Sequence, residues 1–231
     1  MKSIWTKTAA LPAFSVLEGH QQADVAVIGG GLAGMLTAAA LRREGAEVVV
    51  VEANRIGGGQ TAGTTAKLTA QHGLKYHQLI QTLGAEAAGQ YARANLAAVE
   101  RLRQLVRDAC LALGMDVFLT RDTELPFAAQ ALGLRNQACF HPLRLLAALA
   151  EGLTVYEHSR VLTVEEHALS TERGSVSAER IVFACHYPFI NMPGYYFTRQ
   201  HQERSYVLAL KGTKNLQNYY LGIDGEGLSF R

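Results

Sequence analysis

The stretch that decides the fold of this chain is residues 24–52, DVAVIGGGLAGMLTAAALRREGAEVVVVE. Its first five residues, DVAVI, form a short run rich in β-branched residues, as expected for a strand that is buried on both faces. Three glycines follow with GxGxxG spacing, and a helical pattern then continues to Arg42 and Arg43, with Gly45 as a stop. Residues 48–51 form a second apolar run, which ends in Glu52. The stretch therefore predicts a strand, a tight turn, a helix and a second strand.

Each glycine of this turn has a mechanical reason. Gly29 permits the tight turn, Gly31 lets the backbone approach a pyrophosphate, and Gly34 lets the helix pack close to the strand. The N-terminus of the helix offers N–H groups and a positive dipole end to phosphates. Glu52 lies 21 residues after Gly31, where a carboxylate accepts ribose hydroxyls. We therefore favour a dinucleotide site for FAD or NAD over an ordinary glycine-rich turn, and over NADP, whose 2′-phosphate Glu52 would repel.

Composition limits the class of protein. The 231 residues suffice for one large domain or two intimate ones, and 48% hydrophobic with 18% charged residues is typical of a globular chain. A net charge of +2 without a basic run argues against nucleic acid as a partner. The three cysteines form no CxxC pair, which favours reduced thiols and no metal site. Neither a secretory signal nor a membrane span is expected, and we expect a cytoplasmic location.

The stretch after Glu52, ANRIGGGQTAGTTAK, is too rich in glycine and threonine to predict a regular element. Its glycines give a backbone that can follow a ligand, and its threonines offer hydroxyl donors. Because it starts at the predicted ribose-binding carboxylate, we favour a second phosphate or flavin contact over a flexible surface loop. Residues 1–22 are expected to form a leader across the domain, in which Trp5 packs the arm rather than covering the cofactor.

The rest of the chain predicts a mixture of helices and strands. A long amphipathic helix is expected over residues 84–113, and a second helix should begin at Pro142 and stop at Gly152. The predicted strands are residues 154–157, a meander over 161–165, 168–171 and 175–178, a buried strand at 180–185, and tyrosine-rich strands around 204–210 and 218–223.

In this order of motifs the chain resembles the FAD-dependent oxidoreductases of the D-amino-acid oxidase and glycine oxidase superfamily. The likeness is closest to the branch often fused to a Rieske iron–sulfur domain, as suggested by GQTAGTTAKLTAQHG (59–73), QACFHPLRLL (137–146) and ACHYPFIN (184–191). The chain is expected to be a shortened relative without the Rieske domain.

The resemblance implies an α/β fold with a Rossmann-like FAD-binding domain, whose βαβ unit and β-meander belong to a central parallel sheet. This domain is expected to be discontinuous, formed by residues 1–120 and 150–190. A partial antiparallel α+β substrate domain would be formed by residues 121–149 and 191–231.

The resemblance also implies the contacts of the cofactor, position by position. The three glycines of the turn would hold the pyrophosphate, and Glu52, followed by Ala53, would hold the adenosine ribose. The remaining implied contacts are Thr64, Thr65 and Ala66 near the pyrophosphate or flavin, Val161 framing the adenine through its backbone, and Ala184 passing close to the cofactor.

Three residues are candidates for the substrate side of the flavin. His72 would face the flavin ring or the substrate, or be a structural histidine with equal weight. Arg204 and Tyr206 would lie on a strand of the substrate domain, where Arg204 is a candidate clamp for a carboxylate, or else a surface charge. No metal is implied.

The leading functional hypothesis is oxidation of a small amine or amino acid, by hydride transfer from the substrate carbon to the flavin, with oxygen or an electron carrier as the final acceptor. One alternative is a non-catalytic nucleotide-binding protein, or an incomplete flavoprotein subunit that needs a partner chain. A second alternative is an NAD-dependent enzyme. The expected partners are a small-molecule substrate and an electron-transfer protein or partner chain.

Overall fold

The computed structural model describes residues 3–68, 75–112 and 138–187, together with short pieces at 189–190, 195, 198, 212, 220–221 and 229–230. The chain divides into two compact units. The first unit comprises Met1–Ala66 and His141–Arg204, and the second comprises Lys67–Phe140 and Ser205–Arg231. Compactness alone assigns no function to either unit, so the expected domain boundaries stay a prediction.

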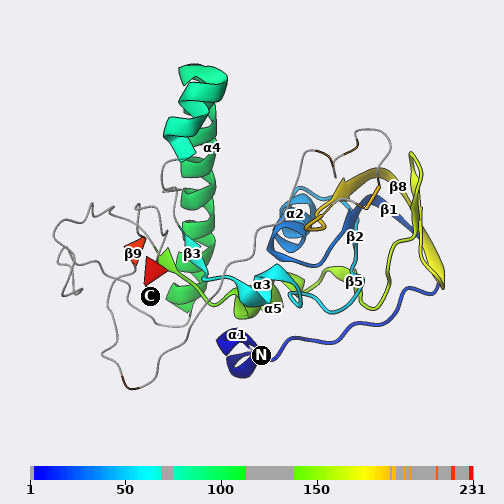
Figure 1. The fold of residues 1–231 in the computed structure, drawn as a ribbon. Coiled ribbons are helices and arrows are strands. Elements are labelled where there is room, and N and C mark those ends of the chain that lie inside the picture. The colour runs from blue at the N-terminus through cyan, green and yellow to red at the C-terminus, as the bar shows by residue number, and fades with distance from the viewer. Residues whose placement is uncertain are drawn as a thin grey trace. The chain divides into compact units, whose positions relative to one another are not determined.

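A six-stranded sheet with the order β5-β2-β1-β8-β7-β6 forms the centre of the first unit (Figure 1). β1, β2, β5 and β8 are parallel, whereas β7 and β6 continue the sheet in antiparallel fashion. This confirms the predicted α/β fold, with its parallel strands and β-meander. The strands are β1 (Gly19–Ile28), β2 (Val48–Val51), β5 (Thr154–Tyr156), β6 (Thr163–Val164), β7 (Ala168–Ser170) and β8 (Gly174–Phe183).

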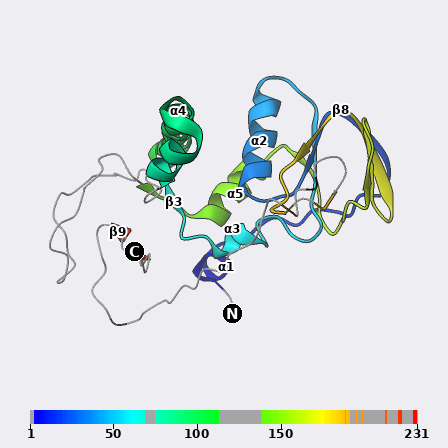
Figure 2. The ribbon, with the colours of Figure 1, turned by 45° about the horizontal axis from the view of Figure 1, so that its top comes forward.

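The sheet is buried on both faces, which explains the continuous apolar run of β2. Val48 and Val50 belong to the core beneath α2 (Leu32–Arg43) and α5 (Pro142–Ala150), and these helices contact each other on that face (Figure 2). Val49 and Val51 point into a second core, which they share with residues of the meander. The predicted second helix is confirmed, including Pro142 in its first turn and Gly152 after its end with φ +72°.

Two strands of this sheet differ from the prediction because their pairing is non-local. β1 begins at Gly19 rather than at Asp24, since residues 19–23 pair in parallel with β8. The predicted leader is therefore too long at its end, and it holds a short helix, α1 (Ile4–Thr8). The two strands expected at 175–178 and 180–185 are one ten-residue strand, because β8 pairs with both β1 and β7.

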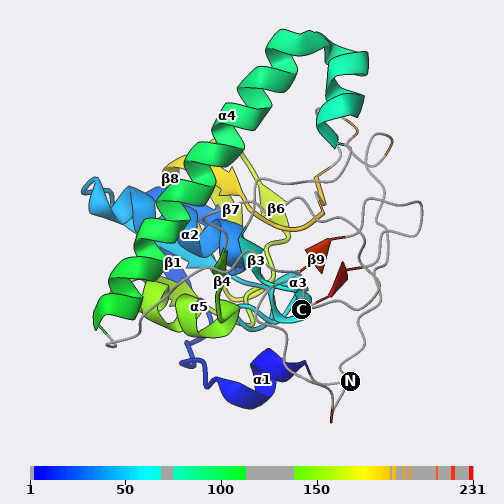
Figure 3. The same ribbon diagram turned by 90° about the vertical axis from the view of Figure 1, so that its left-hand side faces the viewer.

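The prediction that the glycine–threonine stretch holds no regular element is wrong for four of its residues, which form α3 (Gln60–Gly63). The predicted long helix is the second part of α4 (Lys75–Ala112), in which two helices are joined at a kink, and the first part was not predicted. At Gly84, where the prediction placed its start, the backbone has φ +86° and the helix bends (Figure 3). Within the described residues no helix is long and apolar enough to cross a bilayer.

The described residues of the second unit include two antiparallel pairs of short strands. β3 (Lys67–Leu68) pairs with β4 (Ala138–Cys139), and β9 (Tyr220–Leu221) pairs with β10 (Ser229–Phe230). Of the strand expected around 218–223, the structure describes Tyr220 and Leu221, and both belong to β9. The strand expected around 204–210 lies outside the described residues.

Candidate functional site

The candidate site lies at the carboxyl edge of the parallel strands in the first unit. The last residues of β1, β2, β5 and β8 are in register across the sheet. The residues that directly follow them, Gly29, Glu52, Glu157 and Ala184, therefore form one row. Three of their backbone N–H groups continue the strand ladder, donating to the neighbouring strand over 2.8–2.9 Å. Ligands of open α/β sheets bind at this edge.

The glycine turn after β1 is shaped by two close backbone approaches and one open face. Gly29 has φ +113°, and a Cβ there would lie 2.8 Å from the carbonyl oxygen of Ala184. A Cβ on Gly34 would lie 1.9 Å from the carbonyl oxygen of Gly29. At Gly31, the nearest atom to an added Cβ is Thr61 Oγ1, at 3.4 Å. Packing requires the first two glycines, whereas Gly31 leaves room for a ligand to approach the backbone.

Glu52 is held by the backbone on both carboxylate oxygens. Its Oε2 accepts the N–H of Gly30 over 2.7 Å, and its Oε1 accepts the N–H of Asn54 over 2.8 Å. An ionised carboxylate has about four acceptor positions, so each oxygen keeps capacity for another donor. The half-buried carboxylate is thus held in place by the backbone and can still accept hydroxyl donors, which is the chemistry that binding of a ribose requires.

The glycine–threonine stretch folds back onto this turn. Thr61 Oγ1 accepts the N–H of Leu32, in the first turn of α2, over 3.1 Å. The N–H of Gly57 donates to the carbonyl oxygen of Gly30 over 2.9 Å. This places α3 beside the helix N-terminus that would face the phosphates. The residues present therefore fit a dinucleotide along this edge.

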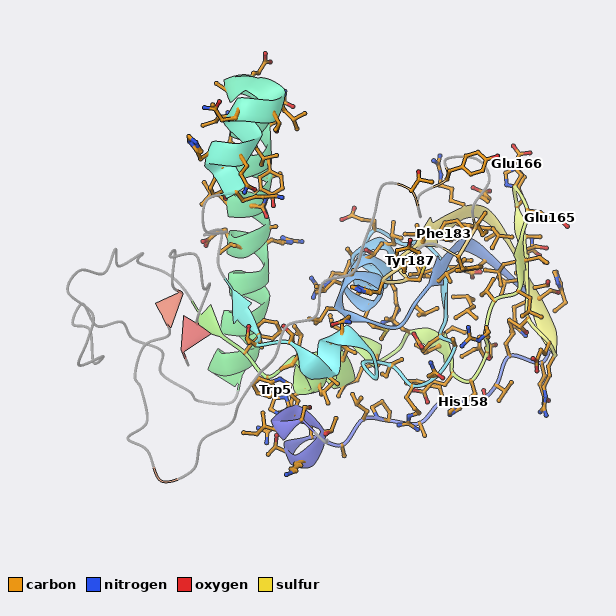
Figure 4. The ribbon with its side chains drawn as sticks, in the orientation of Figure 1. Trp5, His158, Glu165, Glu166, Phe183 and Tyr187 are labelled. Atoms are coloured by element: carbon orange, nitrogen blue, oxygen red, sulfur yellow. The ribbon has the colours of Figure 1, made fainter. Side chains whose placement is uncertain are left out.

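Trp5 ties the N-terminal arm to the same stretch. Trp5 is labelled in Figure 4. Its Nε1–H donates to the carbonyl oxygen of Thr64 over 2.8 Å, and its ring meets that of His141 edge-on. The side chain is 8% exposed, so Trp5 packs the arm as expected. Farther along, Thr64 Oγ1 accepts the N–H of Ala66, which has φ +53°.

Glu157 is the member of the row that the sequence analysis missed as a functional candidate. Its side chain is 0% exposed. Its Oε1 accepts the N–H of Ile56 over 2.8 Å, and its Oε2 accepts the N–H of Phe14 over 3.2 Å and lies 3.3 Å from Arg55 Nε. The sequence contains one indication of its position: the predicted strand 154–157 ends in a glutamate, just as the second predicted strand ends in Glu52.

Cys185, directly after Ala184, is a half-buried free thiol at this edge. Burial raises its pKa, and the negative charge of Glu52 raises it further, while a backbone hydrogen bond lowers it in part. The influence of Glu52 indicates that the thiol lies within electrostatic range of the predicted ribose site.

The remaining predicted site residues differ in burial, and some of them lie outside the described part of the chain. Val161 is buried in the core shared with the meander, and Ala184 packs against Gly29 and Gly34. Ala53 and Thr65 are half-buried. Cofactor contacts of these residues stay predictions, and three candidates lie outside the described residues: His72, Arg204 and Tyr206.

Two cavities lie elsewhere in the first unit. One of about 360 Å³ is lined by the ends of α2 and α5, including Arg42 and Leu149. Another of about 190 Å³ is lined by His158, Arg160 and Arg173. Neither is lined by the glycine turn or Glu52, so they do not mark the dinucleotide edge.

Comparison with known proteins places this geometry in context. Residues 24–231 match a family model described as FAD dependent oxidoreductase. The chain is 31% identical to the putative Rieske 2Fe-2S iron–sulfur protein YhfW of Bacillus subtilis (strain 168), over 100% of this chain and 53% of that protein. It is 26% identical to the probable oxidoreductase OrdL of Rhizobium meliloti (strain 1021), over 75% of this chain and 51% of that protein. The chain thus spans about half the length of the curated relatives it matches.

Among solved structures, an L-amino acid deaminase from Proteus myxofaciens in complex with anthranilate aligns with 80% of this chain and 49% of its own, at 19% identity and a TM-score of 0.47. Glycine oxidase from Geobacillus kaustophilus aligns with 71% of this chain and 55% of its own, at 20% identity and a TM-score of 0.41.

Proposed function

We propose a function for this chain on the basis of its family. The chain belongs to the FAD-dependent oxidoreductases. The match over residues 24–231 confirms the family expected from the sequence motifs, and FAD rather than NAD as the cofactor. The Rieske-named relative also agrees with the branch suggested by the sequence. On this basis, we propose that the chain is the FAD-binding part of an enzyme that oxidises a small amine or amino acid.

The observation that carries the proposal is the row at the carboxyl edge. Gly29 and Gly34 shape the turn, an added Cβ on Gly31 would meet no atom closer than 3.4 Å, and Glu52 keeps acceptor capacity beside its two backbone donors. These features support the proposal that the pyrophosphate lies against Gly31 and the adenosine ribose against Glu52. FAD, when bound, supplies the acceptor for a hydride from the substrate carbon. The protein's own task is to hold the adenosine diphosphate firmly enough to orient the reacting end.

The substrate class rests on the resemblance to the D-amino-acid oxidase and glycine oxidase superfamily. Arg204 is our candidate for binding a substrate carboxylate, because a guanidinium binds a carboxylate through two parallel hydrogen bonds. His72 and Tyr206 are the other candidates for this side. No acid–base residue is required if the substrate amine arrives neutral.

A second candidate function is an FAD-binding subunit that acts with a partner chain. The observation that favours it is the coverage, since the chain spans about half of its curated relatives. The name of one relative, a putative Rieske iron–sulfur protein, supports an iron–sulfur protein as the class of electron acceptor.

The experiment that tests the leading proposal is anaerobic mixing of the FAD-loaded protein with a panel of amines and amino acids. Loss of the oxidised-flavin absorption with a member of the panel is expected. Arg204→Lys should weaken the response to amino acids more than to amines that lack a carboxylate, whereas Arg43→Lys, an exposed exchange on α2, should change neither. A flavin that dithionite bleaches but no amine or amino acid reduces would contradict the proposed substrate class.

A further inference from the structure

Glu157 carries a buried charge that the cofactor contacts described above do not use. Among the residues whose burial is described, it is the one charged side chain in the core, with 0% exposure. Burying a carboxylate is costly unless it is paired and hydrogen-bonded. Replacing such a pair by apolar residues often leaves stability unchanged or higher, so the stability of the fold does not by itself explain an acidic residue here.

The partners of Glu157 lie on two segments that are distant in sequence. Its carboxylate accepts the N–H of Ile56 and pairs with Arg55, both on the loop after Glu52. It also accepts the N–H of Phe14, on the N-terminal arm. Arg55 strengthens this link, because its Nη2 donates to the carbonyl oxygen of Pro12 over 2.9 Å.

The same loop orients Glu52. Asn54 donates its N–H to Glu52 Oε1, and its carbonyl oxygen accepts the N–H of His158 over 2.8 Å. His158, labelled in Figure 4, directly follows Glu157 and has φ +51°, a conformation that non-glycine residues rarely adopt. The N–H of Ser159 donates to the carbonyl oxygen of Glu52 over 2.9 Å. Segment 157–159 therefore holds both the backbone of Glu52 and the loop that fixes its carboxylate.

The loop also contacts the phosphate-facing turn. Ile56 is 0% exposed, and its Cγ2 would lie 2.8 Å from a Cβ on Gly30. The N–H of Gly57 donates to the carbonyl oxygen of Gly30, whose own N–H donates to Glu52. A shift of residues 54–57 would therefore move both supports of the Glu52 carboxylate.

We propose that Glu157 is a positioning residue for FAD: its buried carboxylate fixes residues 54–57 and so sets the orientation in which Glu52 receives the adenosine ribose. Glu157 does not touch the cofactor in this account; it acts through the loop. The inference concerns cofactor binding and is independent of the substrate.

The test is a double-mutant cycle read by FAD affinity. Glu157→Gln keeps the side-chain volume, but its amide turns a donor toward N–H groups or the guanidinium, so we expect FAD to bind about tenfold more weakly. Glu52→Gln should weaken binding as well. The fold-loss in FAD affinity of the double variant should be smaller than the product of the two single fold-losses, because the two glutamates act on the same contact. Glu166→Gln, with the same charge change at a 91% exposed side chain away from His158 (Figure 4), should leave FAD affinity unchanged.

A second readout needs no cofactor. In the apoprotein, hydrogen exchange of the Asn54 amide should be faster in Glu157→Gln than in Glu166→Gln, because the loop would no longer be fixed. If Glu157→Gln does not fold, Arg55→Met carries the same two measurements, since Arg55 is 41% exposed and its removal leaves the backbone donors to Glu157 in place.

Losses in FAD affinity that multiply independently would overturn the proposal, because they would mean that the two glutamates act separately. A Glu157→Gln variant with lower thermal stability but unchanged FAD affinity and Asn54 exchange would reduce Glu157 to a structural residue. Failure of the unaltered chain to bind FAD would also overturn it, whereas failure to oxidise amines would not.

Discussion

The segments that follow β2 and β5 both begin with a glutamate, at neighbouring positions of one sheet edge, yet the two side chains differ in burial and in hydrogen-bond partners. Glu52 is half-buried and binds two backbone N–H groups of its own surroundings, with acceptor capacity left over. Glu157 is fully buried and is committed to Ile56, Phe14 and Arg55. Both residues follow a strand at the same sheet edge, but their burial and partners differ, and on this difference we base the proposals that Glu52 binds the cofactor and Glu157 supports the loop.

The largest difference between the two glutamates is expected when each carboxylate is removed and the free energy of unfolding is measured. Glu157→Leu leaves the buried N–H of Ile56 and the partly buried N–H of Phe14 without their acceptor, so we expect the free energy of unfolding of the apoprotein to fall by about 3 kcal/mol. Glu52→Leu should cost about 1 kcal/mol, because at a half-buried site water can replace the carboxylate as the acceptor of the Gly30 and Asn54 N–H groups. Urea unfolding followed by circular dichroism measures both, and equal losses would contradict the division of roles.

The reverse order is expected for cofactor binding through direct contact. Glu52→Gln should weaken FAD binding by about 2 kcal/mol, a factor of roughly 30, because the charge that receives the ribose hydroxyls is lost. Equilibrium dialysis with flavin fluorescence measures the dissociation constant. A larger loss of FAD affinity after Glu157→Gln than after Glu52→Gln would contradict our assignment of the direct contact to Glu52.

The glycine turn between these segments gives a smaller effect of the same kind. Gly31 has φ −81° and ψ −176°, which any residue adopts, and an added Cβ meets no protein atom closer than 3.4 Å. Gly31→Ala should therefore change the stability of the apoprotein by less than about 1 kcal/mol while weakening FAD binding about tenfold. Gly34→Ala is the matched contrast, since its Cβ would collide with Gly29 at 1.9 Å. Unchanged FAD affinity of Gly31→Ala would place the pyrophosphate elsewhere.

The smallest expected effect is on the thiol of Cys185. Burial first, and the Glu52 charge second, raise its pKa, so its thiolate forms at higher pH than that of an ordinary cysteine and alkylation near neutral pH should be slow. Glu52→Gln should lower the pKa and speed alkylation at a fixed pH, whereas Glu157→Gln should not. Mass spectrometry of the Cys185 peptide against pH measures this, and identical profiles for both variants would mean that the Glu52 charge does not reach the thiol.

Local pattern was sufficient to predict the βαβ unit and the location of Glu52. Residues 24–52 contain the strand, turn, helix and second strand in one continuous stretch. The spacing of their residues is therefore enough to predict how these elements follow one another and where Glu52 lies. Pro142 and Gly152 punctuate α5 in the same local manner.

Features that depend on contacts between distant residues were not predictable in this way. The polar residues at the start of β1 pair with β8, more than 150 residues away, and nothing in their own pattern indicates a strand. The role of Glu157 requires that the arm at Phe14 and the loop at Ile56 converge on it. Its position after a strand was visible in the sequence, but its partners were not.

The most direct measurement is the absorption spectrum of the freshly purified chain, followed by identification of the flavin that heating releases. We predict the bands of oxidised flavin, with about one FAD per chain, because we propose that the row at the carboxyl edge holds the adenosine diphosphate. A protein that is colourless and stays colourless after FAD is added would contradict it.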